Sequence, residues 1–297
     1  MEIDFLTVGN VTHDITPEGF RLGGTVSFAA VTARRLGWHP GILTRASLDG
    51  LTPGAPGPDG MVRTTGLSGT PLADIPVVVQ PSPVATTFTN LYTPEGRTQY
   101  VTAVADPVTP DGLPREWVAA PVVLLGSIAR ELPPHWATVF PRALMGIAPQ
   151  GLMRRWDERG LVTHGRWDDG GMFLRRCDAV FLSREDVGGD EAYIAELANQ
   201  TRLLVVTDGY HGATVYQNGQ ATAIPPRPAR EVDPTGAGDV FATAFLVRYA
   251  ETRNPFLAAR FANIVASMSV EAAGYDAVPE RAEVERWVEA ESLAGKA

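Results

Sequence analysis

Short, nearly continuous runs of Val, Leu and Ile alternate with longer segments of helical character, and this alternation limits the chain to few folds. The runs lie at residues 3–8, 122–125, 179–182 and 203–207. Apolar runs without polar alternation are typical of parallel strands that are covered on both faces. The pattern therefore predicts an α/β fold with a central, mostly parallel sheet flanked by helices.

Residues 75–103 follow a different sequence pattern. Three β-rich runs are separated by the turn-prone sequences PSP and TPEGR, which predicts a strand meander rather than a βαβ unit. Together with residues 11–22, this segment is too small for a core of its own. We expect a small β-strand lid, inserted at about 11–22 and 75–103 in a single domain of residues 1–297.

The charge of the chain narrows the class of partner. The formal net charge is -9 and the pI is about 5.1, whereas binding to nucleic acid or to an anionic membrane needs clustered Lys and Arg. We expect a small-molecule partner, with no nucleic acid and no membrane.

Cysteine content and the first residues bear on location. Cys177 is the single cysteine, so no internal disulfide forms. The start MEIDFLTVG has an acid where a secretory leader has a basic stretch. We expect a cytoplasmic protein.

The stretch DPTGAGDVFATAFL, which begins at Asp233, carries the clearest chemical signal. Gly236, Ala237 and Gly238 have small side chains or none, so their amides can approach an anion at the positive end of the following helix. Asp239 lies in the first turn of that helix. A carboxylate beside an anion hole suits phosphoryl transfer, with Asp239 accepting the proton of the attacking hydroxyl. The alternative is that Asp239 only complements the helix N-terminus while the glycines form a tight turn.

This stretch resembles the C-terminal signature of the ribokinase, or PfkB, family of carbohydrate kinases, which implies a ribokinase-like fold, ATP as phosphoryl donor and Mg²⁺. Thr243 departs from the small residue that is usual there. The family also carries an early glycine pair that contacts the phosphate acceptor, and LGGTVSF supplies Gly23 and Gly24. The resemblance makes Asp14, in GNVTHDI, a ligand of substrate hydroxyls. Without it, the glycines would be a loop and Asp14 a turn residue.

The resemblance further assigns the donor side. In FLSREDV, Ser183 and Asp186 stand where the family has Asn and Glu that order Mg²⁺ through water, and Glu185 is a second candidate for that role. VVTDGYHGATVY places Thr207 and Gly209 beside the nucleotide, although a type I′ Asp-Gly hairpin is the alternative. The resemblance also places Asn263 and Gly274 beside adenine, and it makes Asp233 and Thr235 contacts of a monovalent cation such as K⁺.

The acceptor is predicted from one departure from the family pattern and from a resemblance to one branch of the family. Many sugar kinases of the family have an Asn four residues after the second glycine, where this chain has Phe28. GNVTHD, LGGTVSFAA, TTFTNLYTPEGRTQY and APQGLMRRW resemble the myo-inositol kinase branch, which implies a cyclitol acceptor and makes Ser27, Arg97 and Gln150 candidate contacts. A sugar or nucleoside acceptor is the alternative, and each of the three residues has an ordinary surface or capping alternative. The lid strands of the family often pair between subunits, so a homodimer through the lid is expected if the apolar face of the lid is exposed.

The rival interpretations of the sequence are a Rossmann dehydrogenase and a catalytically silent sensor. A Rossmann dehydrogenase needs a third glycine where Phe241 stands. A catalytically silent sensor on the same fold would not need the whole GAGD turn. Hydrolase and metalloprotease motifs are absent from the sequence, and its five histidines lack ligand spacing.

Overall fold

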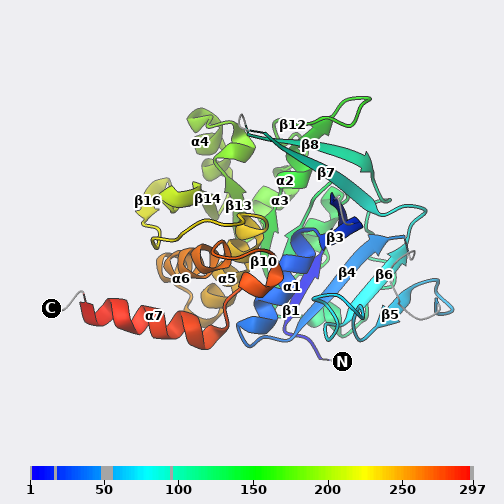
Figure 1. Cartoon of the computed structure of the whole chain (residues 1–297), viewed down its shortest axis with the longest axis horizontal. Helices are drawn as coiled ribbons and strands as arrows, with labels where there is room; N and C mark the ends of the chain where they lie inside the picture. Colours follow the sequence, from blue (N-terminus) through cyan, green and yellow to red (C-terminus); the bar gives the residue numbers. More distant parts are fainter. Residues whose placement is uncertain (1, 17–18, 48–55, 94–95, 295–297) are drawn as a thin grey trace.

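The computed structural model (Figure 1) describes residues 2–16, 19–47, 56–93 and 96–294. Within these ranges, the main sheet contains β1 (Phe5–Val8), β4 (Pro40–Ala46), β5 (Val62–Thr64), β6 (Val77–Pro81), β9 (Val122–Gly126), β10 (Leu144–Ala148), β13 (Ala179–Ser183), β14 (Leu203–Thr207), β15 (Ala213–Gln217) and β16 (Gln220–Ile224). The strand order is β16-β15-β14-β13-β10-β9-β1-β4-β6-β5. The pairs from β14 across to β6 are parallel, and β15, β16 and β5 add antiparallel edges.

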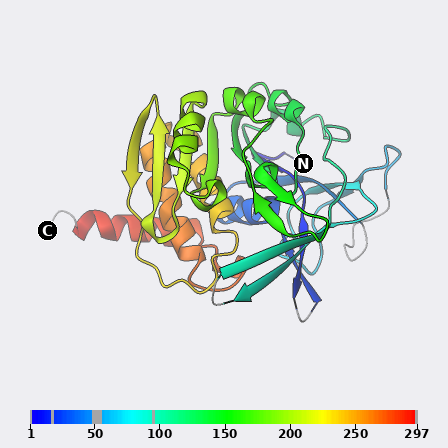
Figure 2. The same ribbon diagram turned by 90° about the horizontal axis from the view of Figure 1, so that it is seen from above.

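Helices cover both faces of this sheet. Helices α1 (Thr25–Arg35), α5 (Ala237–Thr252) and α6 (Pro255–Ser269) pack on one face, and α3 (Gly171–Arg176) and α4 (Glu191–Gln200) pack on the other. Alternate residues of one strand enter opposite layers, as Val122 and Leu124 join the α5 side while Val123 and Leu125 join the α4 side. Figure 2 shows the sheet between these layers. The predicted α/β fold with a central, mostly parallel sheet is confirmed.

Local sequence explains where two of these helices begin. The Asp190 side chain accepts a hydrogen bond of 2.9 Å from the Tyr193 amide at the start of α4. The Asn254 side chain accepts from the amides of Phe256 and Leu257 at the start of α6, where Pro255 is the first helical residue. Both are standard N-cap arrangements. The sharp α5–α6 connection that results brings the end of α6 back beside the beginning of α5.

A second sheet stands apart from the first, with strand order β3-β2-β7-β8. Its members are β2 (Thr12–Thr16), β3 (Gly19–Gly23), β7 (Thr86–Thr93) and β8 (Gly96–Ala103). One face packs Phe88 and Val101 against Ala129, while Ile15, Phe20 and Leu91 are 46%, 48% and 49% exposed. The expected meander was wrong in one part, because β6 pairs parallel with β4 in the main sheet. Its residues Val77 and Val79 are buried there, whereas the meander was expected to lie outside the core.

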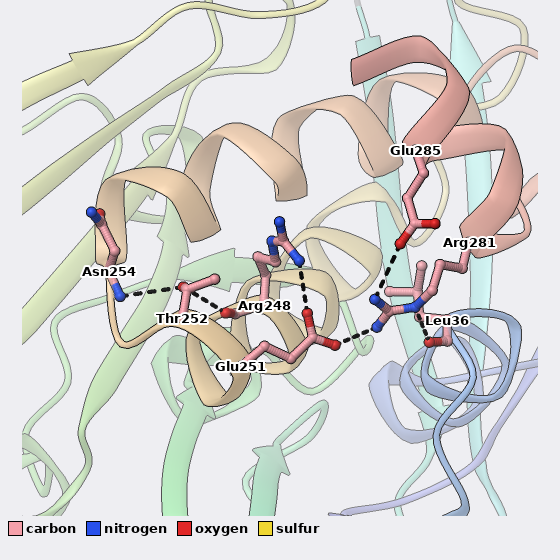
Figure 3. A network of polar contacts seen from close by, with 7 residues as sticks. All are labelled: Leu36, Arg248, Glu251, Thr252, Asn254, Arg281 and Glu285. Carbon is pink, nitrogen blue, oxygen red and sulfur yellow. Dashed lines mark hydrogen bonds and ion pairs between the residues drawn. The ribbon is translucent and has the colours of Figure 1, made fainter. Parts of the chain in front are cut away.

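The last helix, α7 (Arg281–Ala294), packs on the body through the buried Val284, and Arg260 of α6 pairs with Glu291 near its end. The Arg281 guanidinium donates to Leu36 O at 2.7 Å and pairs with Glu251 of α5 and with Glu285. Glu251 also accepts from Arg248 at 3.0 Å (Figure 3). Burial would raise the pKa of Glu251, but its bonds with Arg281 and Arg248 outweigh that effect and lower the pKa. The network therefore joins α7 to the ends of α1 and α5. In the described part of the chain, no helix has the length and apolarity that a membrane crossing requires.

Candidate active site

The candidate site lies at the carboxyl-terminal edge of the parallel strands. Strands β1, β9, β10, β13 and β14 all end at this edge, and α5, which packs on β9, β10 and β13, begins there. Ligand sites of open α/β sheets occur at this edge. The second sheet starts here too, since β2 follows the end of β1 after a short connection.

The turn before α5 requires glycine at one position. Gly236 is the N-cap residue and has φ 79°, a backbone conformation that residues with a Cβ rarely adopt. A Cβ there would lie 2.5 Å from the Phe28 ring. The Ala237 amide donates to Pro234 O at 3.1 Å, so it is already used within the turn. The amides of Gly238 and Asp239 lie in the first turn of α5, where the helix provides no acceptor.

Asp239 is part-buried in the first turn of α5. Burial raises the pKa of Asp239 to about 6, although a hydrogen bond with the Thr25 side chain and the charge of Arg154 act against the rise. The negative charge of Asp186 contributes to the rise. A carboxylate with a pKa near 6 is ionised at neutral pH and is a stronger base than an ordinary aspartate.

The predicted acceptor residues meet where β3 joins α1. A Cβ on Gly23 would lie 2.4 Å from Asp14 Oδ2, so this glycine leaves room for that carboxylate. Gly24 has φ 90° and lies against Asn10 O. Ser27 is fully buried and donates to Gly23 O at 2.9 Å. The structure thus gives Ser27 a role in holding the glycine turn.

Gln150 joins two charged residues of the site. It begins α2 (Gln150–Met153), its Nε2 donates to Asp186 Oδ1 at 2.8 Å, and its Oε1 accepts from Arg154 at 2.8 Å. Arg154 begins the short strand β11 (Arg154–Trp156), which pairs with β12 (Val162–His164). Arg97 lies in β8 opposite Tyr92, and its side chain falls outside the described part of the structure.

Arg154 links this polar group to the second sheet. It is 3% exposed, donates to Ile128 O at 2.9 Å, and has Cζ 5.1 Å from the centre of the Phe88 ring in β7. Sequence reasoning missed Arg154, although it lies in the quoted stretch APQGLMRRW four residues after Gln150. Thr25, which directly follows the glycine pair, was also missed.

Ser183, Asp186 and Glu185 lie at the end of β13. The Asp186 carboxylate is 4% exposed and accepts from the Ser183 amide at 2.7 Å as well as from Gln150. Glu185 begins the 3-10 turn η3 (Glu185–Val187) and is exposed. In the described ranges, no three His, Cys, Asp or Glu side chains gather closely enough to hold a metal ion. Mg²⁺ takes oxygen ligands, often through water, and the carboxylates of Asp186 and Glu185 are the candidates for such contacts.

Thr207 ends β14, and Gly209 lies in the loop between β14 and β15. Gly209 begins the 3-10 turn η4 (Gly209–His211), and Asp208 N donates to Gly212 O at 2.8 Å. The alternative of a two-residue type I′ hairpin was wrong, because residues Asp208 to Gly212 connect Thr207 to its partner Ala213. The longer loop is compatible with a place beside a nucleotide.

The other donor-side candidates form tethers between loops. The Asn263 amide donates to Ile224 O and Pro225 O at 3.1 and 3.0 Å. The Asp233 carboxylate accepts from the amides of Thr235 at 3.0 Å and Gly274 at 3.4 Å. Asp233 and Gly274 thus connect the segment before α5 with the segment after α6. These backbone contacts give Asp233 a structural role that needs no cation.

Glu131 is a buried glutamate that sequence reasoning missed, and it supports the loops at the carboxyl-terminal edge of the main sheet. Both Glu131 carboxylate oxygens accept hydrogen bonds, from the amides of Asn10, Ile128 and Ala129 and from the Ser127 hydroxyl, at 2.8–3.1 Å. Glu131 is 1% exposed. It therefore fixes the loops that follow β1 and β9 relative to each other.

Comparisons with known proteins agree with this geometry. A family model described as pfkB family carbohydrate kinase matches residues 175–281. Inositol 3-kinase of Zea mays is 26% identical over 265 residues, covering 82% of this chain and 65% of that protein. Ribokinase of Bacillus subtilis (strain 168) is 42% identical over 90 residues, covering 30% of this chain and 31% of that protein. The chain thus spans less than two thirds of the length of these relatives.

A solved structure extends the likeness over the whole chain. It is a pyrophosphate-dependent kinase in the ribokinase family complexed with a pyrophosphate analog and myo-inositol. The TM-score is 0.75 at 20% identity, covering 95% of this chain and 99% of that one. At this identity the likeness establishes the fold, and the predicted ribokinase-like fold is confirmed.

Proposed function

We propose, for a chain that belongs to the pfkB carbohydrate kinase family and has the ribokinase-like fold, that it phosphorylates a hydroxyl of a small polyol with Asp239 as catalytic base. The observation that supports this proposal most is the position of Asp239. Its carboxylate lies in the first turn of α5, beside the Gly236 turn, with its pKa raised to about 6. A base and a cluster of amide donors at one helix N-terminus suit phosphoryl transfer.

The proposed reaction uses few protein groups. The acceptor hydroxyl transfers its proton to Asp239 while its oxygen forms a bond with the terminal phosphorus of the donor. The bond from that phosphorus to the bridging oxygen breaks, and the shortened donor leaves. The first-turn amides of α5 stabilise the charge on the transferred group. Mg²⁺ bound with the donor would neutralise phosphate charge, with Asp186 and Glu185 near its water shell.

The proposed acceptor is a cyclitol such as myo-inositol. Support comes from the identity with the Zea mays inositol 3-kinase over most of this chain and from the position of Asp14 above the glycine turn. A sugar or a nucleoside is the alternative acceptor. The 42% identity with Bacillus subtilis ribokinase over 90 residues supports this alternative.

ATP is the proposed donor, and pyrophosphate is a second candidate because the compared structure belongs to a pyrophosphate-dependent kinase. The nucleotide would lie along the loops at Ser183, Thr207 and Gly209, toward Asn263 and Gly274. A dependence on K⁺ through Asp233 and Thr235, a cytoplasmic location and a homodimer through the second sheet stay predictions. The exposed Ile15, Phe20 and Leu91 of that sheet support the dimer.

The test measures donor cleavage by the purified protein with Mg²⁺ and either ATP or pyrophosphate. The panel contains myo-inositol, other cyclitols, ribose, fructose and nucleosides. Cleavage that depends on one acceptor and is lost in Asp239→Asn supports the kinase. Asp74→Asn, at a side chain that is 87% exposed, is the matched control. Acceptor binding without cleavage by either donor would favour a ligand sensor instead.

A further inference from the structure

Phe28, which stands where many sugar kinases of the family have an Asn, is part of an aromatic pair. Phe28 is 6% exposed and stacks on Tyr275, with ring centres 4.3 Å apart and planes at 25°. Phe28 also lies directly under Gly236 of the anion turn. Tyr275 begins the 3-10 turn η5 (Tyr275–Ala277) after Gly274, whose φ is 71°. The pair therefore lies between the acceptor and donor sides of the site.

The Tyr275 hydroxyl faces the acceptor side. It donates to Leu22 O at 2.7 Å, next to Gly23, and contacts the Ser27 hydroxyl. The charges of both Asp14 and Asp239 act on it. The Tyr275 hydroxyl thus lies at the turn where Gly23 adjoins the Asp14 carboxylate.

The chemistry of this hydroxyl follows from its partners. Burial raises the pKa of Tyr275 far above its usual value, so the group is neutral at any working pH. Its one hydrogen is directed to Leu22 O. The Ser27 hydroxyl that contacts it directs its own hydrogen to Gly23 O, so the phenol oxygen keeps acceptor capacity for another hydroxyl. Asp14 and Asp239 are hydrogen-bond acceptors as well.

We propose that Tyr275 is a positioning residue of the acceptor site, whose oxygen accepts a hydrogen bond from a hydroxyl of the same polyol that Asp14 binds. The inference rests on the proposed function and adds the substrate class. Three neighbouring acceptors select a ligand with several adjacent hydroxyl donors. We expect this side of the site to prefer an uncharged polyol, because a ligand that presents a carboxylate to it would be repelled by Asp14 and Asp239.

The first experiment measures binding without turnover. Calorimetric titration of myo-inositol into the full chain, with a non-hydrolysable ATP analogue or a pyrophosphate analogue present, compares wild type, Tyr275→Phe and Tyr249→Phe. Tyr249 is a buried tyrosine near the far end of α5 and serves as the matched control. We expect binding to weaken by about 3- to 10-fold in Tyr275→Phe, the loss of one neutral hydrogen bond, with unchanged affinity for the donor analogue.

A second experiment separates a direct contact from a general loosening of the site. The monodeoxy analogues of myo-inositol each lack one hydroxyl. In wild type, the analogue without the hydroxyl bound by Tyr275 should bind more weakly than the parent. In Tyr275→Phe, that analogue and the parent should bind alike, while the other analogues keep their losses. Equal binding of myo-inositol to wild type and Tyr275→Phe, or equal losses for every analogue in both proteins, would overturn the inference.

The two proposals fail in different ways. If wild type neither binds a polyol nor cleaves a donor with any acceptor, the proposed function fails. If wild type is active and Tyr275→Phe keeps its acceptor affinity, only the role of Tyr275 fails. Thermal unfolding of each variant checks that the fold is retained.

Discussion

Gln150 donates a hydrogen bond of 2.8 Å to the buried carboxylate of Asp186. The same side chain accepts from Arg154, so one amide satisfies an anion and a cation that both act on Asp239. Charged side chains that are partly buried depend strongly on hydrogen bonds with neutral groups such as this amide. Asp239 is therefore held in an electrostatic setting made by residues that follow two strands, β10 and β13.

Replacing this bridge should weaken the site. Gln150→Ala leaves Asp186 and Arg154 each without one partner, which should lower the free energy of unfolding by about 1–3 kcal/mol and lower kcat more than it raises the KM of the donor. Denaturant unfolding and steady-state kinetics measure the two effects. Gln200→Ala, at an exposed helix end, is the control. Wild-type kinetics in Gln150→Ala would show that the bridge is not needed.

Replacing Asp239, the proposed base, should remove most of the turnover and leave donor binding intact. Asp239→Asn keeps the shape of the side chain but cannot accept the proton, so kcat should fall by ~10²-fold or more. The affinity for the donor, measured by calorimetry, should change little because the first-turn amides remain. Turnover near that of wild type would remove Asp239 from the mechanism.

The raised pKa of Asp239 predicts the pH dependence of the reaction. The base must be ionised, so kcat/KM should rise about tenfold per pH unit below a pH of about 6 and level off above it. The sign for stability is opposite. The folded state binds this proton more tightly than the unfolded chain, so the group loses stabilising effect as pH rises from about 4 to about 6. Asp239→Asn should therefore be more stable than wild type at pH 8 and no more stable below pH 4. A midpoint of activity near pH 4 would contradict the assignment.

Gly236 combines a left-handed backbone with close packing, and the two effects can be separated. Gly236→Ala should lose both activity and about 1–4 kcal/mol of stability, from backbone strain and from contact with Phe28. Gly219 has φ 75° and open space around it, so Gly219→Ala reports the backbone part alone. The double variant Gly236→Ala with Phe28→Leu should recover part of the loss. Equal losses for Gly236→Ala and Gly219→Ala would mean that Phe28 does not limit the turn.

Arg281 should matter for stability and not for chemistry. Arg281→Ala removes the link from α7 to Leu36 O and Glu251 and should lower the free energy of unfolding by about 1–3 kcal/mol with kcat unchanged. Because the pKa of Glu251 is lowered in the folded state, its contribution is present above its unfolded pKa and is lost as pH falls through the folded pKa. The exposed Arg286 gives the matched Arg286→Ala control. A stability difference that persists unchanged at pH 3 would contradict the role of Glu251.

The fold class and the GAGD turn could be predicted from the sequence because both depend on residues that are neighbours along the chain. Strand runs such as 203–207 and the GAGD turn are local patterns, and the structure has β14 and α5 where they were predicted. Glu131 and Arg154 were missed because their partners, the Asn10 amide and the Phe88 ring, are distant in sequence. Val77 to Val79 was misassigned for the same reason. Whether a β-rich run joins the main sheet or the second one depends on which strand it meets, and β6 meets β4.

The hydrogen bond from Tyr275 to Leu22 spans 253 positions of the chain. A ribosome that has made the glycine pair and even the whole GAGD turn has not yet supplied the residue that bonds to Leu22. A growing chain therefore lacks this contact until Tyr275 has been synthesised. Premature termination before Tyr275 leaves a product that lacks this contact, however well its main sheet has folded.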